Sequence, residues 1–165
     1  MIKKIGALAL LIGGVLGAIG GISAFAMIYS IDTRAESAKN SLSEAFALLS
    51  SLDGEAKKIA NMAVLARVGA IILLIASIMV VAGVFMEGSK KNAVISYIVV
   101  GIAAFVGQFM INPITNAEST LNWLVSDTSD NVVKGLIFIG VCGVILAING
   151  LIILFSRKKN INFVG

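Results

Sequence analysis

Residues 5–29 read IGALALLIGGVLGAIGGISAFAMIY, 25 consecutive positions without an acidic, basic or histidine side chain. A helix needs ~20 such residues to cross a hydrocarbon core of about 30 Å. Further runs at 68–86, 93–111 and 135–155 contain 19, 19 and 21 residues. Backbone groups in hydrocarbon must be satisfied within the segment, which a helix achieves. The sequence therefore predicts an all-α, integral membrane four-helix bundle, a single domain over residues 1–165.

The first run also imitates a secretory signal peptide, because Lys3 and Lys4 precede it and Ala24-Phe25-Ala26 has the form of a cleavage site. The run is longer than the 7–15 residues typical of a signal-peptide core. We interpret it as a retained first span, and processing of a leader is the alternative.

Basic residues gather beside the ends of the spans at Lys3–Lys4, Lys90–Lys91 and Arg157–Lys159. Such residues remain preferentially on the cytoplasmic side. This predicts a protein of the cytoplasmic membrane with both termini cytoplasmic and the segments 30–67 and 112–134 outside. The net charge of +4 is then explained by these clusters, and no basic stripe with interleaved aromatics predicts a nucleic-acid partner.

Groups that usually carry chemistry are scarce. The chain has no histidine, Cys142 is its single thiol, and the four runs contain no ionisable side chain. General acid–base catalysis and metal binding draw mainly on such groups. We therefore expect no enzyme activity, no catalytic or metal site and no cofactor, with Cys142 a packing residue.

Small residues recur at four-residue spacing within the runs, a pattern that lets membrane helices approach closely. The helix-packing candidates are Gly13, Gly17, Gly21, Gly143 and Ala147. We expect the first three to form one ridge, which joins either the helices of one chain or neighbouring subunits. Gly17 lies at its centre, whereas Gly83 lies off any ridge and should tolerate a larger side chain better.

A few polar side chains lie inside the predicted spans. At ~1.5 Å per residue, Asn149 comes to a depth from which it could bond Ser77 or Ser96, whereas Gln108 lies near the other end. The candidate intramembrane polar contacts are thus Ser77, Ser96 and Asn149. They serve either as contacts between helices or as the lining of a conduction path.

Beyond the first span, apolar residues follow a heptad spacing typical of a helical seam. The positions are Ile31, Ala35, Ala38, Leu42, Ala45, Leu49 and Leu52. Asp53-Gly54 predicts a turn, after which residues 55–67 return to the second span. The stretch of Asn40-Ser41 and Ser43 has the weakest helical propensity of the outgoing arm, so we expect a break there. The seam could pair with its own return arm or with another subunit. Because it is longer than the return arm, we predict that part of it is left for a partner, with Leu42, Leu49 and Leu52 as the interaction seam.

The second external segment contains Thr115-x-x-Glu118, which has the form of a capping box and predicts a short amphipathic helix. Trp123 on that helix is the predicted membrane-interface anchor. A role as an aromatic binding platform is the alternative.

The order of parts resembles small, uncharacterised four-pass membrane proteins of bacteria and archaea. The resemblance rests on Lys3-Lys4, on Gly88-Ser89-Lys90-Lys91 between spans two and three, and on the terminal Arg157-Lys158-Lys159. It covers the whole chain, but it concerns architecture and implies no activity or site residue.

The sequence favours a non-catalytic structural or accessory subunit of a membrane assembly, acting by helix packing and by self-association or partner docking. The expected partners are the lipid bilayer and either further copies of the chain, in a homo-oligomer, or another subunit of a membrane complex. An oligomeric channel or small-solute conduit, and a membrane-embedded coat protein of a virion or vesicle, are the alternatives.

Overall fold

A computed structural model describes residues 1–38, 41–86, 91–115, 122 and 129–156. Its elements are the helices α1 (Ile2–Ala38), α2 (Leu42–Met86), α3 (Lys91–Met110) and α5 (Asp130–Phe155), with a short 3-10 turn, η1 (Asn112–Thr115), after α3. The described residues contain no strand, and the predicted all-α helical bundle is confirmed.

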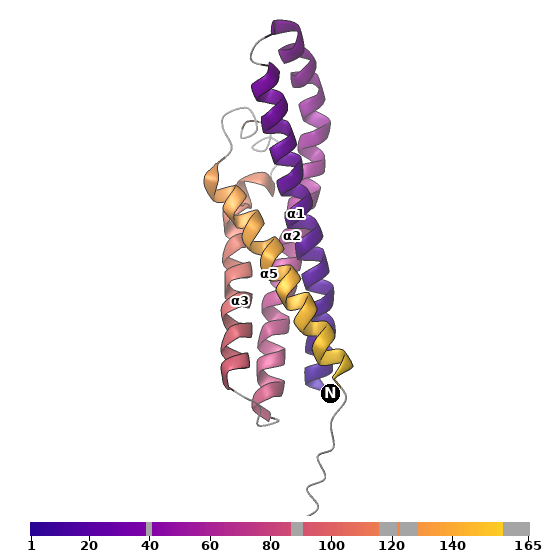
Figure 1. Cartoon of the computed structure of the whole chain (residues 1–165), viewed down its shortest axis with the longest axis vertical. Coiled ribbons are helices and arrows are strands. Elements are labelled where there is room, and N and C mark those ends of the chain that lie inside the picture. The colour runs from indigo at the N-terminus through magenta and orange to yellow at the C-terminus, as the bar shows by residue number, and fades with distance from the viewer. Residues whose placement is uncertain (39–40, 87–90, 116–121, 123–128, 157–165) are drawn as a thin grey trace, which may run out of the picture.

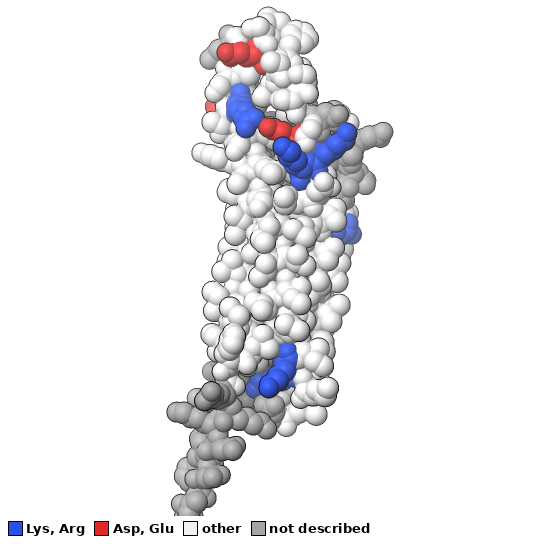
Figure 2. Space-filling model, turned by 90° about the vertical axis from the view of Figure 1, so that its right-hand side faces the viewer, with Lys and Arg blue, Asp and Glu red and all other residues white. Residues whose placement is uncertain are grey.

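Four helical segments are long and apolar enough to cross a membrane: Ile2–Ala38, Gly54–Met86, Asn92–Met110 and Asp130–Phe155. Three of the predicted spans lie wholly inside α1, α2 and α5, and the third span ends one residue beyond α3. On the face in Figure 2, a long band almost without charged residues separates basic side chains near one end of the bundle from a mixed group at the other. These helices are candidate membrane spans.

The four helices pack around one core, with α1 and α3 diagonally opposite each other (Figure 1). α1 packs along α2 and α5, while α3 packs against the same two helices. α5 crosses the bundle obliquely, and its C-terminal end lies close to the N-terminus of the chain. Beyond the other end of α3 and α5, α1 and α2 continue together as a projecting hairpin.

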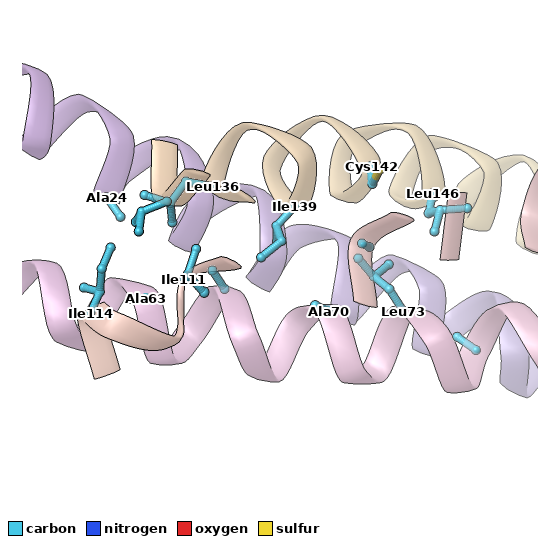
Figure 3. Packing of buried hydrophobic residues seen from close by; sticks show 14 of the residues in the cluster. Ala24, Ala63, Ala70, Leu73, Ile111, Ile114, Leu136, Ile139, Cys142 and Leu146 are labelled. Atoms are coloured by element: carbon cyan, nitrogen blue, oxygen red, sulfur yellow. The ribbon is translucent and has the colours of Figure 1, made fainter. Parts of the chain in front are cut away.

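The core runs the length of the bundle and is formed by one face of each helix (Figure 3). On α2 the buried side chains recur at alternating three- and four-residue steps, as in Ile59, Ala63, Ala66, Ala70 and Leu73. Isoleucines on the outer faces, such as Ile19 and Ile78, are about half exposed or more. A water-soluble surface seldom carries so continuous an apolar face, whereas a lipid-facing surface does.

The predicted turn at Asp53-Gly54 is wrong, because α2 is helical through both residues. The chain instead reverses between Ala38 and Leu42, at the predicted weak point. Ser41 directly precedes α2, and Ser41-x-x-Glu44 has the form of a capping box, although the Ser41 hydroxyl has no hydrogen-bond partner. Glycine inside a helix costs only about 0.5–1 kcal/mol, and exposed Gly54 obstructs nothing, so the helix continues through it.

Candidate functional site

The glycines of α1 lie on two faces of the helix, each against a different neighbour. Gly13 packs on α2, where an added Cβ would lie 2.7 Å from Ile72 Cγ2. Gly14 packs on α5, where an added Cβ would lie 2.5 Å from the Gly143 carbonyl oxygen. A Cβ at either position would force a neighbouring atom to move, and at Gly14 that atom belongs to the backbone of α5.

Seven-residue spacing keeps each of these faces aligned. At 3.6 residues per turn, seven positions rotate the helix by only about −20°, whereas eight rotate it by about 80°. Gly13 and Gly20 therefore both face α2, and Gly14 and Gly21 both face α5. The predicted single ridge of Gly13, Gly17 and Gly21 is thus divided between two helix contacts.

Gly17 lies between the two faces and has more room than its neighbours. An added Cβ would lie 3.4 Å from Ile139 Cγ2 and 3.5 Å from Leu73 Cδ1, which are ordinary contacts. Gly83, by contrast, packs on the start of α1, where an added Cβ would lie 2.8 Å from Lys3 Cβ. The expectation that Gly83 is more tolerant than Gly17 is therefore wrong, since sequence spacing does not reveal the close approach of Lys3.

Gly143 and Ala147, the candidates on α5, both face Gly14 of α1. An added Cβ at Gly14 would lie 2.6 Å from Ala147 Cβ, and one at Gly143 would lie 2.8 Å from the Gly14 carbonyl oxygen. All five helix-packing candidates thus lie at contacts between helices of one chain.

The three polar candidates inside the spans do not bond one another. Ser77 Oγ donates to the Leu73 carbonyl oxygen at 2.7 Å, and Asn149 Nδ2 donates to the Ile145 carbonyl oxygen at 3.0 Å. Ser96 Oγ likewise donates to a carbonyl oxygen one turn earlier in α3. The expected bond from Asn149 to Ser77 or Ser96 is absent, because each side chain satisfies its donor on its own helix.

Ser77 nevertheless has a packing role. It is buried between α2 and α3, and an added Cβ at Gly101 would lie 2.5 Å from Ser77 Oγ.

Two other polar side chains lie near the hairpin end of the bundle. Gln108 of α3 is also buried, and its Oε1 has no hydrogen-bond partner. Arg67 then donates to Asn112 Oδ1 at 3.3 Å, which links α2 to η1.

The hairpin turn divides the heptad pattern, so the predicted seam residues Leu42, Leu49 and Leu52 all lie on α2. Leu52 is buried against α1, whereas Leu42 is 81% and Leu49 is 52% exposed. Phe46, which the sequence reasoning missed, is 69% exposed. We call Leu42, Phe46 and Leu49 the hairpin stripe, since spacings of four and three place them on one face of α2. The same spacing in the sequence could have identified Phe46.

The hairpin stripe lies far along α2 from the part of the helix that could span a membrane. From Lys3 to Ser23, α1 rises about 30 Å, the thickness of a hydrocarbon core, and the nearby Gly20 packs on α2 between Met62 and Ala66, so the far edge crosses α2 near Met62. Leu49 lies 13 residues further along α2, which adds about 20 Å. The interfacial layer extends only about 5–8 Å beyond the core. The bilayer that holds the spans therefore cannot cover this stripe.

An ion pair between Arg34 and Glu55 joins the two arms of the hairpin. Arg34 of α1 contacts Glu55 Oε1 of α2 at 2.8 Å, with the arginine side chain 56% and the glutamate side chain 28% exposed. An exposed pair of this kind contributes at most about 1 kcal/mol. The pair therefore adds little to the stability of the hairpin.

Several predicted features lie outside the described residues: Trp123, the capping-box residue Glu118, the turn at 87–90 and the terminal cluster Arg157–Lys159. Across the described part of the chain, no group of three histidine, cysteine or acidic side chains could hold a metal ion.

Comparison of the chain with protein-family models, with curated proteins and with solved structures finds no match. The function is therefore inferred from the helix contacts and from the exposed residues of the hairpin.

Proposed function

We propose that the protein is a non-catalytic structural or accessory subunit of a membrane assembly, which associates through the hairpin stripe with a second copy of the chain or with another subunit. The observation that carries this proposal is the exposure of Leu42, Phe46 and Leu49 on a helical arm beyond the reach of the bilayer. Large apolar side chains gathered on one exposed face are typical of an interaction surface.

The size of the stripe supports association by helix packing. Burial of each side chain would contribute about 1.5–3 kcal/mol. Between Leu42 and Leu52 the sequence has a single charged residue, Glu44. Covering this face would therefore desolvate few charges, which favours a helix of similar character as the partner.

The glycine contacts support the same class of function. They join helices of one chain, so these glycines are not left for a partner, whereas the hairpin stripe of the described residues is exposed. In the proposed orientation both termini are cytoplasmic and the hairpin is external. The basic residues Lys3 and Lys4, at the end of the bundle away from the hairpin, support that orientation.

The test is a double substitution, Leu42→Glu with Leu49→Glu, compared with Ser43→Glu and Ser50→Glu. Both pairs add two carboxylates at seven-residue spacing to exposed positions on the same arm, but only the first pair changes the stripe. Particle mass in mild detergent and cross-linking in native membranes measure association.

We expect the leucine pair to release the partner or to lower the oligomeric state, while the serine pair leaves both unchanged. The fold is not at risk, because Leu42 and Leu49 are exposed. Equal masses and equal cross-linked products for all three proteins would refute the proposal, as would a wild-type chain that is monomeric and without partners.

A further inference from the structure

A groove of about 410 Å³ runs between α1 and α2 at the base of the hairpin. On α1 it is lined by Ser23, Ala26, Met27 and Ser30. At the outer end Arg34 and, from α2, Glu55 and Lys58 complete it. The groove thus passes from small and apolar side chains to charged ones over a few helical turns.

The position of the groove relative to the bilayer follows from the length of α1. From Lys3 to Ser23, α1 rises about 30 Å, which is the thickness of a hydrocarbon core. The inner end of the groove therefore lies at the edge of the hydrocarbon, and its charged end lies in the layer of lipid headgroups or beyond.

The groove opens toward lipid rather than toward the rest of the bundle. Ser23 is nine residues from Gly14, which places it about half a turn around α1 from the face that contacts α5. Below the groove, Ile12 and Ile19 lie seven residues apart on the same side of α1 and are 48% and 49% exposed. They continue the groove as an apolar track into the hydrocarbon.

The charges leave one positive charge uncompensated. Arg34 is paired with Glu55, whereas Lys58 has no ion-pair partner among the described residues. A lysine at this level can bend its side chain toward the membrane surface. The net charge of the groove, +1, matches the single negative charge of a phosphodiester.

We propose that this groove binds one anionic phospholipid of the leaflet on the hairpin side. The phosphate lies near Lys58, the glycerol region contacts Ser23 and Ser30, and an acyl chain follows Ile12 and Ile19. A phosphodiester joined to an apolar chain matches this order of charged, polar and apolar groups, whereas a free phosphate would use only the charged end.

The proposal is tested by native mass spectrometry of the detergent-solubilised chain, titrated with phosphatidylglycerol and with phosphatidylcholine of the same acyl chains. We expect the first phosphatidylglycerol to bind about fivefold more tightly, the effect of one lysine near an anionic lipid. Lys58→Gln should abolish this preference. The matched control Lys57→Gln, one residue away and outside the groove, should keep it.

Two further measurements distinguish a bound lipid from a bound free phosphate. Ser23→Leu fills the inner end of the groove and should weaken binding of both lipids, while millimolar inorganic phosphate should not displace the bound phosphatidylglycerol. Equal affinity for the two lipids, an equal loss in the Lys57 and Lys58 variants, or displacement by phosphate would each overturn the proposal. Protection of the buried Cys142 from a thiol reagent shows that each variant is folded.

Discussion

Substitution of Gly14 by alanine should destabilise the bundle, whereas the same substitution at Gly17 should not. An alanine Cβ at Gly14 would lie 2.5 Å from the Gly143 carbonyl oxygen, and at Gly17 the nearest atom would be 3.4 Å away. The Gly14 variant must therefore push the α5 backbone outward by close to 1 Å. Both variants gain the same helix propensity, up to about 1 kcal/mol, so this term cancels between them.

The difference in free energy of unfolding should be about 1–3 kcal/mol, the usual cost of overpacking a core. At Gly17 the neighbouring atoms are the ends of flexible Ile139 and Leu73 side chains, which can adjust. We expect the melting temperature of Gly17→Ala to equal or exceed that of the wild type, and that of Gly14→Ala to fall below it.

Cys142 supplies the assay, because it is the single cysteine of the chain and is buried on α5. A maleimide dye that becomes fluorescent on reaction would report the exposure of this thiol as the detergent-solubilised protein is heated. Equal melting temperatures for the two variants, or a lower one for Gly17→Ala, would refute the assignment of Gly14 to the backbone contact with α5.

Two further predictions concern the hairpin and the orientation of the chain. Gly54→Ala should raise the free energy of unfolding by about 0.5–1 kcal/mol in the same thermal assay, because no atom lies near its added Cβ and α2 is helical there. A lower melting temperature would instead favour the turn expected from Asp53-Gly54. In a Cys142→Ala background, a cysteine at Ser51 should react with an impermeant reagent applied to intact cells and one at Ser89 should not; labelling at Ser89 would contradict the proposed orientation.

Hydropathy alone predicts the four helices well, because the cost of exposing backbone groups to hydrocarbon acts on each segment by itself. The reversal of the hairpin is harder to predict, because two competing local signals occur within fifteen residues. Asp53-Gly54 is typical of a turn, but a lone exposed glycine is also tolerated in a helix. The weak helical propensity around Asn40-Ser41 was the better signal.

The partners of the small residues could not be predicted from spacing. Gly13, Gly17 and Gly21 look equivalent in the sequence, yet a rotation of 100° per residue directs Gly13 to α2 and Gly21 to α5. Likewise, Gly83 has no small neighbour in the sequence pattern and still packs on Lys3. Such contacts depend on where two helices cross, which involves residues far apart in the chain.

The two glycine faces of α1 have a consequence for the order in which the bundle is assembled during synthesis. α1 and α2 can pair as soon as α2 has entered the membrane, because the face with Gly13 and Gly20 needs no other helix. The face with Gly14 and Gly21 must wait for α5, which is made after the other three helices, and α3 also packs on α5. A nascent chain halted after α3 would keep a bare glycine surface in the lipid, open to capture by another protein's helix.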